Sequence, residues 1–121
     1  LEAAMIDAPK DMQGESLIPL LKGNSDKWNR ESVYYHYYEY PSVHMAKRHY
    51  GIVSKDYKLV HFYFDVDEWE LYDRKNDPNE MNNVYNDPNY TDVVVKLKAE
   101  LKELRIKYTD SEELDKSFLY N

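Results

Sequence analysis

The stretch 49-HYGIVSKDYKLVHFYF-64 predicts a β-hairpin. Most of its residues are aromatic or β-branched, and such side chains suit a pleated, half-buried surface. Lys55-Asp56 is placed to form the short turn between two strands, 49–56 and 57–64. In the second strand, alternate side chains should fall on opposite faces of a sheet, with Tyr57, Leu59, His61 and Tyr63 on one face and Lys58, Val60, Phe62 and Phe64 on the other.

Two further strands are predicted on either side of this hairpin. The first is 32-SVYYHYY-38, which stops before Pro41, and the last is 68-EWELYD-73. Because the connections are short, the four strands should form an antiparallel meander. The segment 73–90 that follows is rich in Asn, Asp and Pro, which is typical of turns.

A long helix is predicted at the end of the meander. Asp87-Pro88 is a start signal, and Thr91 or Asp92 could cap the helix. One apolar stripe runs along it with spacings of three and four, formed by Val94, Leu97, Leu101, Leu104 and Tyr108. The stripe must be buried, and the sheet is the large apolar partner available. The predicted fold class is therefore α+β, a four-stranded antiparallel sheet packed by one long C-terminal helix.

We interpret the chain as three parts, a connector (1–31), a folded domain (32–110) and a polar tail (111–121). The connector is broken by Pro and Gly and has one apolar knot, 17-LIPLL-21, which should pack on a domain outside this sequence. The tail should be frayed, although Phe118, Leu119 and Tyr120 could dock. Because the chain opens without Met, we expect it to be part of a longer protein. Apolar surface left without its partner would favour self-association.

Composition excludes several function classes. A formal charge of −7 over 121 residues argues against a nucleic-acid partner. The chain has no Cys, which excludes a disulfide framework, a thiolate metal site and a cysteine nucleophile. No apolar run reaches membrane-spanning length, so no membrane partner is expected.

The sharpest candidate site is the basic segment inside 36-HYYEYPSVHMAKRHYG-51. Arg offers a planar fork for sulfate, phosphate or carboxylate, Lys offers a mobile charge, and His can donate from either ring nitrogen. Nearby Tyr rings could form a platform for a sugar. The alternative is the solvated end of a hairpin, held by acids such as Asp65 and Asp67, and spacing alone slightly favours it. The candidate anion-binding residues are His44, Lys47, Arg48 and His49.

Other polar clusters are better explained as structure. The acidic turn 65-DVDE-68 lacks the glycine and the ligand spacing of a calcium loop, so a solvated turn is favoured. His36 and His61 stand within predicted strands, where a histidine is more often satisfied and half-buried than a ligand. No metal site is predicted within this chain.

Three segments in order resemble type I (formylglycine-dependent) sulfatases. They are 11-DMQGESLIPLLKG-23, 49-HYGIVSKDYKLVHFY-63 and 69-WELYDRKNDPNEMNNVYND-87. The last is similar to that family's "E-L-Y-D…D-P-x-E-x-x-N" motif, and a C-terminal helix follows it there as well. The pattern of aromatic residues and His around 33–51 resembles the branch found in gut Bacteroidetes that desulfates host glycans.

The resemblance implies an α/β parent enzyme of the alkaline-phosphatase type, of which this chain would be the C-terminal subdomain. It also implies a catalytic domain with a formylglycine and Ca²⁺, and a periplasmic or secreted location. The nucleophile motif Cys/Ser-x-Pro-x-Arg is missing here, since Ser16 has its proline one place too late. The isolated chain should therefore be inactive and bind neither cofactor.

Three roles follow for the chain within that family. The first is to close the active-site cleft and help bind a sulfated glycan, with His44 and Arg48 the first residues to contact the anion. The second is a non-catalytic module whose Tyr-rich face binds glycan by itself. The third is a purely structural subdomain that touches no substrate.

Overall fold

The structure is a computed structural model that describes residues 1–119. Internal contacts divide the chain into two compact units, Leu1–Arg30 and Glu31–Asn121. The first unit holds three short helices, η1 (Glu2–Ala4), α1 (Ile18–Leu21) and η2 (Ser25–Lys27). The predicted apolar knot forms α1, where the Ser16 hydroxyl accepts a hydrogen bond from the backbone N–H of Ile18 at 3.2 Å.

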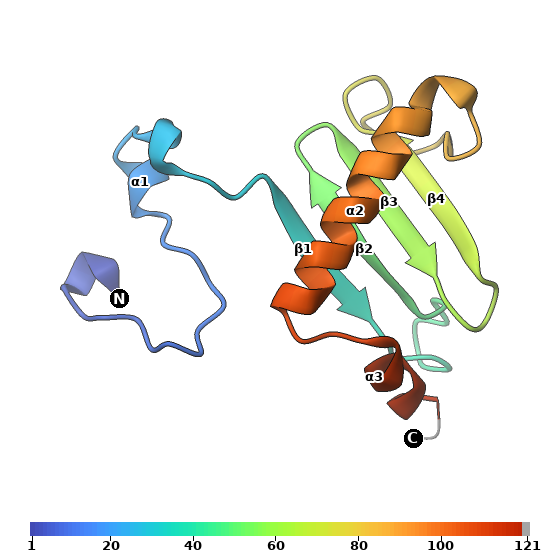
Figure 1. The fold of residues 1–121 in the computed structure, drawn as a ribbon, viewed down its shortest axis with the longest axis horizontal. Coiled ribbons are helices and arrows are strands. Elements are labelled where there is room, and N and C mark those ends of the chain that lie inside the picture. Colours follow the sequence, from blue (N-terminus) through green and yellow to red (C-terminus); the bar gives the residue numbers. More distant parts are fainter. Residues whose placement is uncertain (120–121) are drawn as a thin grey trace. The chain divides into compact units, whose positions relative to one another are not determined.

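The second unit is built on a four-stranded antiparallel sheet (Figure 1). The strands lie in sequence order as β1 (Ser32–Tyr37), β2 (His49–Ser54), β3 (Tyr57–Phe62) and β4 (Glu68–Asp73). The predicted meander is confirmed, and three strands end one or two residues before the predicted limits. Lys55 and Asp56 form the predicted turn, across which the backbone N–H of Tyr57 donates to the Ser54 hydroxyl at 3.1 Å.

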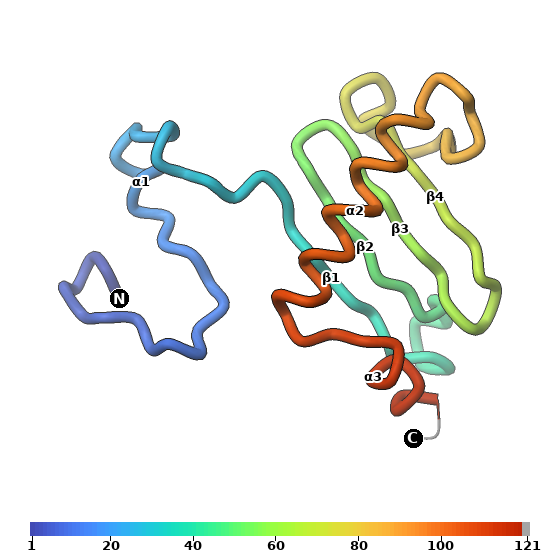
Figure 2. Tube along the Cα trace, viewed as in Figure 1, coloured from blue at the N-terminus to red at the C-terminus, as the bar shows by residue number. Residues whose placement is uncertain are grey.

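The core lies between this sheet and α2 (Thr91–Lys107), which crosses one face of the sheet (Figure 2). Strand register places Ile52 opposite Leu59, and Leu59 opposite Leu71, so the three side chains form one row. All three are 0% exposed. From α2, Leu97 and Leu101 are buried in the same cluster, as the predicted stripe requires.

The start of α2 differs from the prediction. Asp87 accepts a hydrogen bond from the backbone N–H of Asn89 at 2.9 Å and so caps a 3₁₀ turn, η3 (Pro88–Tyr90), that runs into α2. Tyr90 is the N-cap of α2 and makes no side-chain capping bond. The predicted cap at Thr91 or Asp92 is therefore wrong, because the turn opened by Asp87 already aligns the backbone for the helix.

The predicted turn chemistry of segment 73–90 is confirmed. The buried Asp73 carboxylate accepts hydrogen bonds from the backbone N–H groups of Lys75 and Asn76 and from the Tyr90 hydroxyl. These hydrogen bonds hold the pKa of Asp73 below its usual value, and the bond from the Asn76 backbone N–H has the largest effect. Asp73 thereby ties the loop and the start of α2 to the end of β4.

The C-terminal segment corrects another expectation. Residues 112–117 form α3 (Glu112–Ser117), with the Ser111 side chain accepting from the backbone N–H of Leu114. Asp115 is 3% exposed, and the Phe118 ring stacks on Tyr38 with centroids 4.3 Å apart. The tail is thus folded rather than frayed, because an ion pair and an aromatic contact offset the cost of ordering it. Phe118 docks as predicted; Tyr120 lies outside the described residues.

Within residues 1–119, no helix combines the length and apolar character needed to cross a membrane.

Gly51 occupies a position on β2 where no side chain fits. A Cβ there would lie 2.5 Å from the Leu59 carbonyl oxygen and 2.8 Å from the Tyr35 hydroxyl. The Leu59 oxygen is backbone and cannot move without disturbing β3. We therefore expect Gly51→Ala to lower the free energy of unfolding by about 1–3 kcal/mol. Urea unfolding measures this, and a change below about 0.5 kcal/mol would contradict the crowding seen here.

Candidate functional site

The candidate anion-binding residues lie on the connection between β1 and β2 and at the first residue of β2. His44 is exposed, Lys47 and His49 are half-buried, and Arg48 is 5% exposed. The backbone turns tightly in this loop, with the N–H of Met45 donating to the Ser42 carbonyl at 3.0 Å. The four residues therefore differ strongly in how much of each side chain a ligand could reach.

Arg48 is committed to contacts within the chain. Its guanidinium donates to the Tyr40 carbonyl, lies 3.3 Å from the Asp65 carboxylate, and reaches the Phe118 carbonyl at 3.4 Å. Its Nε atom is buried without a hydrogen-bond partner. The pair with Asp65 is the contact that the hairpin-end interpretation anticipated. Arg48 is thus built to hold the loop in shape.

Lys47 and His49 make separate contacts at this end of the loop. Lys47 Nζ donates to the Tyr40 hydroxyl at 2.6 Å. His49 Nδ1 lies 2.7 Å from the Lys47 carbonyl, and its ring stacks on Tyr37 with centroids 5.4 Å apart. His49 consequently belongs to the sheet face opposite α2, whereas Lys47 and Tyr40 form one polar group beside Arg48.

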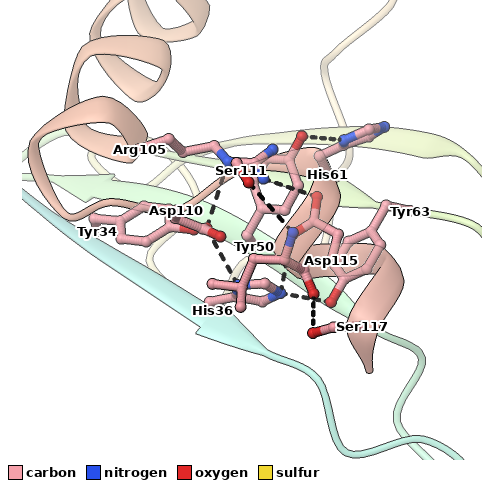
Figure 3. Close-up of polar contacts among 11 residues, drawn as sticks. Tyr34, His36, Tyr50, His61, Tyr63, Arg105, Asp110, Ser111, Asp115 and Ser117 are labelled. Carbon is pink, nitrogen blue, oxygen red and sulfur yellow. Dashed lines mark hydrogen bonds and ion pairs between the residues drawn. The ribbon is translucent and has the colours of Figure 1, made fainter. Parts of the chain in front are cut away.

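A second cluster joins residues that no local pattern connects (Figure 3). His36 of β1 lies between two carboxylates, with its Nδ1 3.2 Å from Asp110 and its Nε2 3.8 Å from Asp115. The His36 Nε2 also bonds the Tyr63 hydroxyl. Arg105 of α2 binds both acids, at 3.4 Å to Asp110 and 2.7 Å to Asp115. We call these four charged residues, His36, Arg105, Asp110 and Asp115, the buried network.

Three members of the buried network offer ligand atoms close enough together to hold a metal ion. The ligand atoms of His36, Asp110 and Asp115 lie within 4.8 Å of one another. However, Arg105 forms an ion pair with each of the two carboxylates, and both ring nitrogens of His36 have partners. The interpretation of His36 as a satisfied strand residue therefore holds. No sequence signal could have named Asp110 and Asp115 as its acidic partners, because both lie more than 70 residues away along the chain.

His61 has an equivalent arrangement on β3. Its Nδ1 lies 2.8 Å from the Tyr50 hydroxyl and its Nε2 3.0 Å from Asp67, while the ring stacks on Trp69. With Asp65 bound to Arg48, both aspartates of turn 65–68 pair with a base of the chain. This supports the turn interpretation of 65-DVDE-68 over a cation site.

Burial sets the protonation of these groups. It lowers the pKa of His36, against the opposing pull of Asp110 and Asp115, and it lowers the pKa of His61 against Asp67. Burial raises the pKa of Asp115, an effect that Arg105 opposes. It also raises the pKa of Tyr34, which donates to Asp110.

These directions predict a pH dependence of stability. Because the folded state favours neutral His36 and His61, their contribution is complete above the ordinary pKa of 6.5 and declines as the pH falls below it. Asp115 has the opposite effect at lower pH. Because burial raises its pKa, protonation of its carboxylate stabilises the folded state. We expect the free energy of unfolding to decrease between pH 7 and pH 5.

Urea titrations at several pH values measure this slope. His36→Gln keeps hydrogen-bonding atoms but does not titrate, so its slope should be shallower than that of the unmodified chain. His44→Gln, at an exposed position, is the matched control. An unchanged slope in His36→Gln would exclude His36 as a source of the dependence.

The fold and the ordered motifs define a class, the C-terminal sheet-and-helix subdomain of sulfatases with the alkaline-phosphatase-like fold. The chain belongs to the family described as "N-sulphoglucosamine sulphohydrolase, C-terminal", whose model matches residues 1–107. The predicted resemblance to the sulfatases is thereby confirmed, including its likeness to those of Bacteroides.

Individual relatives agree with this assignment. The chain is 46% identical over 114 residues to an N-acetylglucosamine-6-O-sulfatase of Bacteroides thetaiotaomicron, covering 93% of this chain and 20% of that protein. It superposes with a TM-score of 0.86 and 45% identity on a protein solved in complex with its substrate, D-glucosamine-2-N,6-O-disulfate, over 92% of this chain and 23% of the other. A 2-O GAG sulfatase superposes with a TM-score of 0.77 at 29% identity, over 90% of this chain and 23% of that one. The chain thus spans about a fifth of the length of the curated sulfatase.

Proposed function

We propose that the chain is the C-terminal part of a sulfatase that hydrolyses sulfate esters of glycans, with sulfated glucosamine units as the substrate class. The observation that carries this is the 46% identity to an N-acetylglucosamine-6-O-sulfatase across nearly the whole chain. The relative that was solved with a disulfated glucosamine supports the same substrate class. A periplasmic or secreted location belongs to the proposal and rests on the family alone.

The chemical step belongs to a catalytic domain outside this sequence. In sulfatases of this type, a formylglycine supplies the nucleophile and Ca²⁺ stabilises charge on the sulfate. This chain has no Cys and no Ser-x-Pro-x-Arg, so it cannot supply the formylglycine. We expect the 121-residue chain alone to show no sulfatase activity.

The role of this chain in the proposal is to close one side of the cleft with loop 41–50. In this proposal the sulfated sugar is contacted by His44, which is exposed, and by Lys47, whose Nζ donates to the Tyr40 hydroxyl. Arg48 and His49 stay in the proposed site, but their contacts suit them to shaping the loop. A catalytic domain resting on the sheet face opposite α2 would cover Val33, which is 47% exposed. In its absence that face favours self-association.

His44→Ala in the full-length protein tests the loop. Loss of a hydrogen bond to a charged group costs about 1.5–3 kcal/mol, so kcat/KM for D-glucosamine-2-N,6-O-disulfate should fall by roughly 10- to 150-fold. Val43→Ala changes a neighbour that is 93% exposed and is the matched control. If His44→Ala and Lys47→Ala both leave kcat/KM unchanged, loop 41–50 is not a substrate site and the purely structural role gains support.

A further inference from the structure

The end of α3 contacts both ends of the connection between β1 and β2. The Phe118 ring stacks on Tyr38 with an interplanar angle of 13°. The Phe118 carbonyl accepts from Arg48 at 3.4 Å. Tyr38 is the first residue after β1, and Arg48 is the last residue before β2. Phe118 therefore contacts Tyr38, just before the proposed substrate loop 41–50, and Arg48 near the end of that loop.

The other end of α3 is fixed to the core. Asp115 binds Arg105 of α2 at 2.7 Å and lies 3.8 Å from His36 of β1, and its side chain is 4% exposed. The Ser111 side chain caps the helix. A buried ion pair of this kind has one geometry, because leaving either partner alone in the interior is costly. Asp115 thus ties α3 to α2 and β1 through contacts separate from those that Phe118 makes with the loop.

The middle of the loop is exposed, and its other supports are mainly at its two ends. Between Tyr38 and Arg48 it contains exposed residues, among them Val43 at 93% and Met45 at 63% exposure. Its exit is held by the Arg48 contacts to Tyr40 and Asp65. A loop that binds substrate must be ordered before the ligand arrives, or the ordering cost reduces affinity.

We propose that α3 is a positioning strap for segment 38–48. Asp115 fixes the helix to Arg105 and His36. Phe118 at the end of the same helix binds Tyr38 and Arg48, which keeps the segment ordered before substrate arrives. The match to the family model ends at residue 107, so α3 lies beyond the part of the chain that defines the family. The strap rests on the proposed function only for its effect on substrate binding. Its effect on the order of the loop is independent of any ligand.

Phe118→Ala in the full-length protein tests the strap with two separate readouts. Hydrogen exchange of the peptide covering 38–48 should accelerate about three- to tenfold, as expected for loss of one aromatic contact and a weakened hydrogen bond. KM for D-glucosamine-2-N,6-O-disulfate should rise by a similar factor, with kcat nearly unchanged, because ordering a binding loop acts on substrate binding. Phe118→Tyr keeps the stacked ring and should restore both values.

The control is Leu114→Ala, which truncates a 42% exposed apolar side chain on the same helix. It should leave exchange in 38–48 unchanged. Unchanged exchange in Phe118→Ala, or equal acceleration in peptides of β3, would overturn the strap. Faster exchange without a change in KM would support the strap and count against the substrate role of the loop, so the two proposals can fail separately.

Discussion

Arg105→Ala is expected to lower the free energy of unfolding by about 3–5 kcal/mol, the range found when one partner of a buried ion pair is removed. Arg105 lies between Asp110 and Asp115, whose side chains are 6% and 4% exposed. Without the guanidinium, two carboxylates remain close together in the interior. The guanidinium carbon also lies 3.9 Å from the centroid of the Tyr50 ring, so a cation–π contact is lost as well.

Chemical denaturation at pH 7 measures this loss, with Lys102→Ala at an exposed position of α2 as the matched control. The loss of stability caused by Arg105→Ala should become smaller as the pH is lowered. An acid whose pKa is raised in the folded state takes up a proton more readily there, so its protonation stabilises the fold. Burial already raises the pKa of Asp115 in the presence of Arg105. A cost below about 1 kcal/mol, or one independent of pH, would mean that the acids rearrange toward water.

Local patterns predicted the elements whose burial follows a regular period. Alternation along 57–62 placed Leu59 on the face that α2 covers, and the three-and-four spacing placed Leu97 and Leu101 against it. The same reasoning missed α3. A segment of six residues carries too little periodicity to predict a helix, and its stability depends on Asp115 meeting Arg105, which is a tertiary contact.

The candidate loop shows a second limit of sequence reasoning. The sequence showed a cluster of basic residues, but it could not show which of their side chains is buried. Arg48 is buried because Asp65 and two carbonyl oxygens surround its guanidinium, and those partners come from three separate segments. His44, by contrast, is exposed to solvent. The distinction between a residue that shapes a site and one that contacts a ligand is therefore made by the fold.

Leu59→Ala should lower the free energy of unfolding by about 2–5 kcal/mol. Leu59 is 0% exposed and stands in the middle of the row on the sheet, opposite both Ile52 and Leu71. The cavity would open beneath α2, where Leu97 and Leu101 are held by the backbone of their helix. Because neighbours on two strands and one helix are fixed by hydrogen bonds, the site can collapse only slightly, and the cost should lie in the upper half of the range.

Urea unfolding of Leu59→Ala compared with Val95→Ala isolates this effect. Val95 lies on α2 and is 64% exposed, so its truncation should change stability by less than about 0.5 kcal/mol. Leu59→Met nearly conserves volume and should cost less than about 1.5 kcal/mol. If alanine and methionine at position 59 were equally damaging, cavity formation could not be the cause. The row on the sheet would then be sensitive to side-chain shape rather than to side-chain volume.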